Sequence, residues 1–311
     1  MRPARSWLYV PGDRPERIGK ALASDADEVI LDLEDAVAPA AKDEARRAVL
    51  ATLADGHRAH VRINATDGSH GRADVAALAA APGALAGVRV PKCENPGELG
   101  RVADALGVAV HPVVESAFGV EHAYALATAH PLVAGISLGE ADLAADLRVP
   151  GVESLTWPRS RIVVAARAAG LPSPVQSAWT AVRDLDGLRA DTEAGRKAGF
   201  FGRSVLHPAQ IPVVHEACAP DPDEVARARS LVDALRVTDE AAWIDHSGRF
   251  VDAAVVEQAR WLLSITGEGT SRRTGNDAES VHKVQTDQRD GPARQDRHSA
   301  ERTNNDEGHA P

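Results

Sequence analysis

Short apolar runs rich in β-branched residues alternate along the chain with longer alanine-rich stretches that have helical spacing. The expected strands lie at residues 7–10, 28–33, 60–64, 87–92, 108–114, 132–138, 175–182 and 203–206. This alternation predicts a parallel-stranded α/β protein. About eight strand–helix units over roughly 210 residues favour a TIM (β/α)8 barrel. An open doubly wound sheet is the alternative, and it is disfavoured because no Gly-x-Gly-x-x-Gly turn follows the first strand.

Beyond the last strand, the pattern changes to two amphipathic segments, at 220–235 and 251–265, which predict two helices joined by a loop. From residue 268 onward the chain has no Phe, Trp, Leu or Ile, and such a composition is typical of disorder. The expected organisation is therefore a barrel domain over 1–218, a C-terminal helical extension or lid over 219–266, and a disordered polar tail over 267–311.

Polar side chains follow most of the predicted strands. Apart from Pro11-Gly12 after the first strand, these are Glu34, Asp35, Arg62, Asn64, Lys92, Glu94, Glu115, Glu140, Asp142 and His207. In a barrel of parallel strands, all of them fall on the carboxyl-end face, which carries the active site. Each residue alone is as well explained by solvation or an ordinary structural role, but their convergence predicts a functional site.

Two of these carboxylates, Glu115 and Asp142, close consecutive strands, and such a pair completed by water and substrate is the usual way to hold Mg²⁺. No Cys or paired His lies nearby, so zinc is disfavoured. Arg62 offers a planar fork that could hold a carboxylate or stabilise an enolate. Lys92 raises a rival hypothesis, a Schiff-base aldolase; the excess of acids favours the metal, with Lys92 ion-paired to Glu94 or its neighbours.

Bulk properties exclude several other classes. The net charge of −10 argues against a nucleic-acid-binding surface. The two cysteines, Cys93 and Cys218, have no ligand-type spacing and fit a reducing compartment. No run approaches the roughly 18 apolar residues of a membrane span, and no signal-peptide core is evident, so a soluble cytoplasmic protein without membrane partners is expected.

Seven segments together resemble the citrate lyase β-subunit-like branch of the HpcH/HpaI aldolase superfamily, which includes malyl-CoA and citramalyl-CoA lyases. They follow the family order from about residue 5 to about residue 265. They are Arg-Ser-Trp-Leu-Tyr-Val-Pro-Gly at 5–12, Leu-Asp-Leu-Glu-Asp-Ala-Val at 31–37, Val-Arg-Ile-Asn at 61–64, Val-Pro-Lys-Cys-Glu at 90–94, Val-Glu-Ser at 114–116, Leu-Gly-Glu-Ala-Asp-Leu at 138–143, and the stretch 199–211 ending in His-Pro-Ala-Gln-Ile.

The resemblance implies a barrel with a C-terminal helical extension, assembled as a homotrimer or a dimer of trimers, that uses Mg²⁺ (or Mn²⁺) and a coenzyme A thioester. Glu115 and Asp142 would bind the metal, and Arg62 would contact the carbonyl that becomes an enolate. Glu34 and Asp35 would hold metal-bound waters or orient Arg62, whereas Asp32 is interpreted as structural. The remaining implied positions are Asp252 as acid/base supplied across the trimer interface, Arg5, Arg17 and Lys20 at the CoA phosphates, and Arg62, Glu115, Gly139, Glu140, Ala141 and Asp142 at the substrate.

The sequence departs from the family near the expected acyl pocket. Arg203 stands where the family usually has Lys, Leu206 where it has Ile, and Gln176 and Ala181 where acids are frequent; the Asp-x-Pro motif is here Asp252-Ala253-Ala254. The expected activity is lysis or formation of a 3-hydroxyacyl-CoA such as malyl-CoA or citramalyl-CoA, giving acetyl- or propionyl-CoA and a 2-oxo acid. Alternatives are a citrate lyase β-subunit that acts on an acyl-carrier-protein thioester, a malyl-CoA thioesterase, and a catalytically silent binding protein.

Overall fold

The structure is a computed structural model that describes residues 3–80, 83–235, 242–245 and 247–266, with the side chains of 152 and 153 excepted. The tail expected to be disordered, 267–311, lies outside the described residues. In the part of the chain that is described, no helix is long and apolar enough to cross a membrane.

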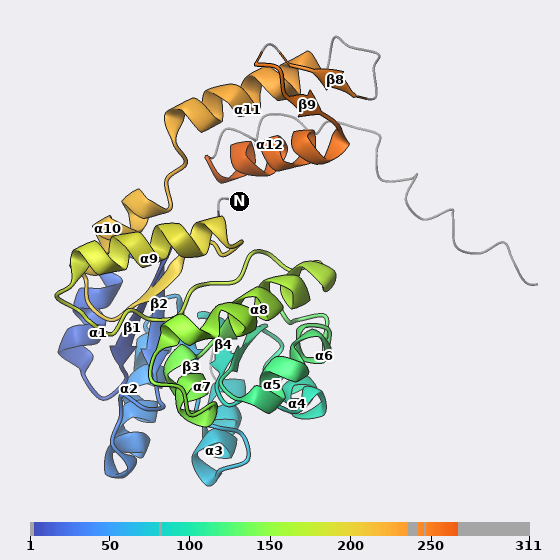
Figure 1. Cartoon of the computed structure of the whole chain (residues 1–311). Helices are drawn as coiled ribbons and strands as arrows, with labels where there is room; N and C mark the ends of the chain where they lie inside the picture. Colours follow the sequence, from blue (N-terminus) through green and yellow to red (C-terminus); the bar gives the residue numbers. More distant parts are fainter. Residues whose placement is uncertain (1–2, 81–82, 236–241, 246, 267–311) are drawn as a thin grey trace, which may run out of the picture. The chain divides into compact units, whose positions relative to one another are not determined.

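The described chain begins with strands and helices in alternation, as the hydrophobic pattern predicts (Figure 1). The strands are β1 (Ser6–Pro11), β2 (Glu28–Asp32), β3 (Ala59–Arg62), β4 (Leu85–Val90), β5 (Ala109–Val114), β6 (Ser137–Leu138) and β7 (Arg203–Val205). The connecting helices are α1 (Pro15–Leu22), α2 (Lys42–Ala54), α3 (Ser69–Ala79), α4 (Pro96–Leu106), α5 (Ala117–Glu121), α6 (Ala123–Ala127), α7 (Glu140–Asp146), α8 (Thr156–Ala168), α9 (Leu185–Lys197) and α10 (Gln210–Ala217), with 3-10 turns η1 (Pro39–Ala41) and η2 (Val152–Leu155).

Seven parallel strands form one sheet in the order β6-β5-β4-β3-β2-β1-β7. Isolated parallel bridges join Ser137 to Val175 and Gln176 to Arg203, so the pairing passes from β6 through residues 175–176 to β7. The curled parallel sheet is consistent with a TIM-like barrel. The predicted seventh strand at 175–182 is reduced to these two bridges, because Pro172 and Pro174 interrupt the preceding chain.

The apolar residues of the strands and of the inward helix faces form a continuous buried core. Ile30, Leu31 and Leu33 of the second strand region have no exposed surface, and neither do Val49 of α2 and Leu126 of α6. At about 25 cal/mol per Å² of apolar area, burial on this scale is the main favourable term in folding. This core fixes the strand ends on which the polar residues sit.

The two helices predicted after the barrel strands are present as α11 (Pro222–Ala234) and α12 (Ala253–Ile265), and they pack against each other. Asp221 begins α11 by accepting hydrogen bonds from the backbone N–H groups of Asp223 and Glu224, and Asp252 begins α12 in the same way. Between them, β8 (Trp243–Ile244) and β9 (Phe250–Val251) pair as a short antiparallel hairpin.

Candidate active site

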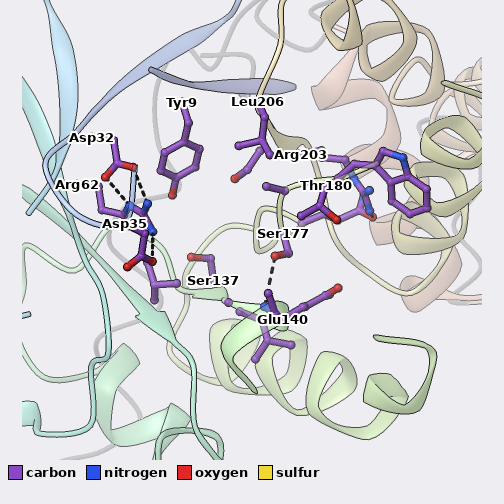
Figure 2. A pocket seen from close by; sticks show the side chains of 18 of the residues that line it. Tyr9, Asp32, Asp35, Arg62, Ser137, Glu140, Ser177, Thr180, Arg203 and Leu206 are labelled. Carbon is purple, nitrogen blue, oxygen red and sulfur yellow. Dashed lines mark hydrogen bonds and ion pairs between the residues drawn. The ribbon is translucent and has the colours of Figure 1, made fainter. Parts of the chain in front are cut away.

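A cavity of about 660 Å³ opens at the carboxyl ends of the strands (Figure 2). The strand-end arrangement predicted from the sequence is therefore present, and one cavity gathers residues from positions between 9 and 206. Among the predicted site residues, its lining includes Arg17, Asp35, Arg62, Glu115, Gly139, Glu140, Ala141 and Asp142, and it also includes Tyr9, Asp32, Arg89, Arg159, Ser177, Asp191 and Arg203.

Arg62 is held on one wall of the cavity by carboxylates from the second strand region (Figure 2). Its Nε and Nη2 donate to the two oxygens of Asp32 at 2.8 and 2.6 Å, and its Nη1 lies 2.7 Å from Glu34 Oε2 and 3.6 Å from Asp35 Oδ2. Burial, the largest single influence, opposes the charge, but the hydrogen bonds to Asp32 together with the charges of Asp32 and Glu34 raise the pKa of Arg62. Arg62 is therefore a fixed cation whose Nε and Nη2 are already engaged by Asp32.

Asp32 has a larger part in this arrangement than its interpretation as structural implies. It pairs in register with Arg62 across β2 and β3, which places the two side chains side by side. It also accepts from the backbone N–H of Glu34 at 2.9 Å and fixes the turn that follows the strand. Of the three carboxylates around Arg62, Asp32 makes the bidentate contact and Asp35 is the most distant.

Glu34 links Arg62 to Lys92. The Lys92 ammonium makes a short contact with Glu34 Oε1 and lies 3.8 Å from Asp35 Oδ1, so its ion-pair partner is Glu34, whereas Glu94 accepts from the Ser116 hydroxyl. Burial raises the pKa of Glu34 despite the nearby Arg62 and Lys92 cations. An ammonium engaged in this way is a poor Schiff-base nucleophile. We call Asp32, Glu34, Asp35, Arg62 and Lys92 the Arg62 cluster.

Glu115 and Asp142 lie beside this cluster, as predicted from the ends of consecutive strands. Glu115 follows β5 and is buried, and it accepts from the backbone N–H of Lys92 at 2.8 Å. Asp142 is exposed in the first turn of α7. Burial, followed by the negative charges of Glu34 and Asp142, raises the pKa of Glu115 to about 7. A carboxylate that other acids destabilise in this way is suited to a cation.

The absence of a side chain at Gly139 leaves space for the Glu115 side chain. A Cβ atom at Gly139 would lie 2.3 Å from Glu115 Cγ, so the carboxylate packs directly on the backbone that begins α7. No group of three or more His, Cys, Asp or Glu side chains that could hold a metal ion is found among the described residues. A pair of carboxylates bordering an open cavity nevertheless fits Mg²⁺, which usually keeps several waters and takes one or two protein carboxylates.

The opposite wall carries a second charged group, which we call the Arg159 cluster. Arg159 of α8 donates from Nε and Nη2 to both oxygens of Glu140, each at 2.7 Å, and lies 3.5 Å from Asp191 of α9. Asp191 also contacts Arg203, which donates to Gln176 at 2.7 Å. The predicted substrate residue Glu140 is thus tied to Arg159, and its backbone N–H donates to Ser177 Oγ at 3.4 Å (Figure 2).

The predicted CoA-binding residues are not all brought together. Arg17 of α1 is exposed and lines the cavity, and Lys20 is exposed on the same helix. Arg5 instead precedes β1, at the amino end of the strand, where its guanidinium makes two 2.9 Å hydrogen bonds to Asp27. Asp252 accepts from the N–H groups of Ala254 and Val255 and is not among the residues that line this cavity.

Several lining residues escape sequence reasoning. Arg89 stands within the apolar run of β4, and Arg159 and Asp191 lie within helices, so none of them follows a strand as the other site residues do. Tyr9 stands in the middle of β1 and lies with its ring centroid 5.1 Å from the Arg62 guanidinium carbon. Only Arg89 left a signal in the sequence. An arginine within a buried strand points to a special role, because an unpaired guanidinium is costly there.

Comparison with known proteins extends what the geometry shows. The family model described as HpcH/HpaI aldolase/citrate lyase matches residues 5–208. A (3S)-malyl-CoA thioesterase of Cereibacter sphaeroides is 36% identical over 287 residues, covering 90% of this chain and 96% of that protein. A citrate lyase subunit beta-like protein of Mycobacterium tuberculosis is 37% identical over 273 residues, covering 85% and 96%.

A solved structure shares the fold over most of the chain. The structure of CitE from Mycobacterium tuberculosis in complex with magnesium, acetoacetate and coenzyme A has a TM-score of 0.74 and 34% identity, and covers 86% of this chain and 100% of that one. The resemblance carried by the strand-end motifs is thereby confirmed: the chain belongs to the HpcH/HpaI aldolase/citrate lyase family.

Proposed function

We propose that this protein is a Mg²⁺-dependent carbon–carbon lyase that cleaves or forms a 3-hydroxyacyl-CoA such as malyl-CoA or citramalyl-CoA. The products of cleavage are acetyl-CoA or propionyl-CoA and a 2-oxo acid. One observation supports this above all others: a rigidly held guanidinium, Arg62, and an under-compensated carboxylate pair, Glu115 and Asp142, border the same cavity. Retro-aldol chemistry needs both, one for the enolate and one for a cation.

Glu115 and Asp142 would hold the metal, with Gly139, Glu140 and Ala141 forming the adjoining substrate surface at the start of α7. When bound, Mg²⁺ would act as a Lewis acid toward the substrate's carboxylate and hydroxyl oxygens. The solved relative that binds magnesium and coenzyme A supports this assignment. Because burial and Glu34 raise the pKa of Glu115, binding of the metal would also relieve the repulsion among these acids.

The carbon–carbon bond would break as the hydroxyl passes its proton to a water held by Glu34 and Asp35 and becomes the carbonyl of the 2-oxo acid. The electron pair of the broken bond would pass to the thioester as an enolate. Arg62 would stabilise the enolate oxygen from a position that Asp32 and Glu34 fix in advance. Glu34 and Asp35 would also order water at the metal. Asp252 of the partner subunit would then give a proton to the enolate carbon, or remove it in the condensing direction.

This role for Asp252 goes with the finer proposals on architecture. We propose a complete (β/α)8 barrel over 1–218 and a helical extension or lid over 219–266, in a cytoplasmic homotrimer or dimer of trimers. The exposed cations Arg17 and Lys20 on α1 would meet the CoA phosphates. Arg5 was assigned to the same group from the resemblance, but its pairing with Asp27 at the amino end of β1 favours a structural role.

A second candidate is hydrolysis of the malyl-CoA thioester, and the 36% identity to a (3S)-malyl-CoA thioesterase favours it. Hydrolysis would follow if water reached the malyl-CoA thioester carbonyl at Arg62 before cleavage or after condensation, releasing malate and CoA. The third candidate is a citrate lyase β-subunit acting on an acyl-carrier-protein thioester, which co-purification with such a carrier would support.

One assay separates these outcomes. The protein is incubated with Mg²⁺, acetyl-CoA or propionyl-CoA and a panel of 2-oxo acids, and the products are identified by mass. A 3-hydroxyacyl-CoA adduct supports the lyase, and a free hydroxy acid with free CoA supports the thioesterase. Asp142→Ala should abolish the metal-dependent turnover, and turnover that persists in EDTA would contradict the proposal.

A further inference from the structure

We propose that Arg89 is a specificity residue that receives a second carboxylate on the acid half of the substrate. The inference rests on the proposed lyase and narrows its substrate class, because it predicts that the preferred 2-oxo acid is a dicarboxylate. The 3-hydroxyacyl-CoA would then be of the citryl type, and not malyl-CoA or citramalyl-CoA, whose 2-oxo acids carry a single carboxylate.

Arg89 is buried, and no residue that the structure describes serves as its counter-ion. Only 3% of its surface is exposed, yet it lines the cavity. Within the described residues, no carboxylate lies within ion-pair distance of its guanidinium, and its Nε has no hydrogen-bond partner. The one hydrogen bond of the guanidinium to the described residues runs from Nη1 to the Tyr9 hydroxyl, at 3.5 Å. A buried cation in this state is unfavourable unless an anion joins it.

Aromatic rings lie against the Arg89 guanidinium. Its guanidinium carbon lies 4.8 Å from the ring centroid of Trp7 and 5.7 Å from that of Tyr9. Burial lowers the pKa of His60, and burial followed by the Arg89 charge lowers the pKa of His111 well below the ordinary value, so both rings are neutral near pH 7. Glu28, the acid nearest His60, lies 3.4 Å from His60 Nε2 and 3.5 Å from Arg58.

Arg89 of β4 differs from Arg62 of the neighbouring strand β3 in how its charge is compensated. Arg89 pairs in register with Arg62, so the two guanidinium groups stand side by side and share Tyr9. Arg62 is compensated by Asp32 and Glu34, whereas Arg89 is not compensated by any carboxylate of the described chain. Of the two, Arg89 is therefore the one whose charge is free to attract an anionic group of a ligand.

The chemistry of a CoA thioester says which anion this would be. The large CoA group must extend out of the cavity, so the half of the substrate that reaches the strand residues is the acid half. Its first carboxylate is expected at Glu115 and Asp142 through the metal, and a second carboxylate would meet Arg89. Oxaloacetate is such an acid, and 2-oxobutyrate is its four-carbon counterpart with a methyl group in place of that carboxylate.

The test compares these two acids in the condensing assay with acetyl-CoA and Mg²⁺. The wild-type protein should prefer oxaloacetate in kcat/KM, and Arg89→Met should reduce this preference by about 10- to 100-fold, the range expected for hydrogen bonds to a charged group. Arg89→Lys should retain part of the preference. Arg58→Met, which removes an exposed arginine of the adjacent region, should leave the preference unchanged.

Calorimetric binding of both acids to the Mg²⁺-loaded proteins separates the two proposals. If no thioester is turned over but Arg89→Met abolishes tighter binding of oxaloacetate, the proposed lyase fails and the role of Arg89 stands. A wild-type protein without preference, or an Arg89→Met variant that weakens both acids equally, would overturn the role of Arg89. Should Arg89→Met fail to fold, Arg89→Lys and Arg89→Gln carry the same comparison.

Discussion

The two charged clusters that flank the cavity differ in how their charges balance. The Arg159 cluster sets two carboxylates, Glu140 and Asp191, against two guanidinium groups, Arg159 and Arg203. The Arg62 cluster places three carboxylates against Arg62 and Lys92, and Glu115 and Asp142 add further negative charge at its edge.

This difference distinguishes a scaffold from a binding site. A set that is balanced in charge, with Glu140 held by two nitrogens of Arg159, links α7, α8 and α9 along the cavity wall. An unbalanced set leaves a group that something else must complete, which is the cation at Glu115 and Asp142 in our proposal. Substitutions in the Arg159 cluster should therefore impair stability, and substitutions in or beside the Arg62 cluster should impair catalysis or metal binding.

The largest effect is expected from unbalancing the scaffold. Arg159→Met leaves Glu140, only 8% exposed, without its bidentate partner. Breaking a buried ion pair costs about 3 to 5 kcal/mol, so the free energy of unfolding should fall by that amount. Urea denaturation followed by circular dichroism measures it. A change below about 1 kcal/mol would mean that the Arg159 cluster does not hold this wall.

The next effect is on catalysis and belongs to the other cluster. Arg62→Lys keeps a positive charge but loses the planar fork that Asp32 positions, so kcat should fall by about 10²- to 10³-fold, as when an oxyanion donor is removed. Arg159→Lys is the matched control, and its kcat should change by only a few-fold. If both variants fold and lose equal amounts of kcat, the two clusters do not differ in their part in catalysis.

Many residues of the candidate site could be predicted from the sequence, and those that could not were missed for physical reasons. Residues near the strand ends, such as Glu115 and Asp142, could be found from the sequence, because polar residues that follow several buried parallel strands meet at one face of the sheet. Sequence patterns carry no register, however, so they did not show that Asp32 lies opposite Arg62. Nor did they single out Arg159 and Asp191, since charged residues within helices are usually solvated.

The strand boundaries teach the same lesson. The apolar run at 132–138 predicts a full strand, but only Ser137–Leu138 pairs as one, with a separate bridge from Val133 to Val110. Hydrophobic residues indicate burial, and here Val133, Ile136 and Leu138 are buried although the segment does not pair as one continuous strand. The cavity end of β6 is nevertheless where the sequence predicts it, which is why the site residues were found.

A third effect comes from the metal. Mg²⁺ at about 100 times its dissociation constant should stabilise the folded protein by about 2.7 kcal/mol, and EDTA should remove this gain. Glu115→Gln deletes the charge that would bind the metal, so its melting temperature should not respond to Mg²⁺. Arg159→Lys should respond as the wild type does. A Glu115→Gln protein stabilised as strongly as the wild type would place the cation elsewhere.

The smallest effect tests the interior beneath the Arg62 cluster. His111 has a folded-state pKa well below 6.5, chiefly through burial and then through the charge of Arg89. As the pH falls below about 6.5, the unfolded chain therefore binds the proton first, and stability is lost at about 1 kcal/mol per pH unit. The stabilising contribution is fully present above that pH.

His111→Gln should remove this part of the slope between pH 6.5 and 5, measured by urea unfolding at each pH and referred to the same variant at pH 7. His60, whose pKa is lowered less strongly because Glu28 opposes the effect of burial, would contribute the smaller remaining slope. A slope unchanged in His111→Gln would mean that His111 accepts a proton in the folded state. Arg89 would then lie beside a second positive charge, and the cavity floor would be more cationic still at low pH.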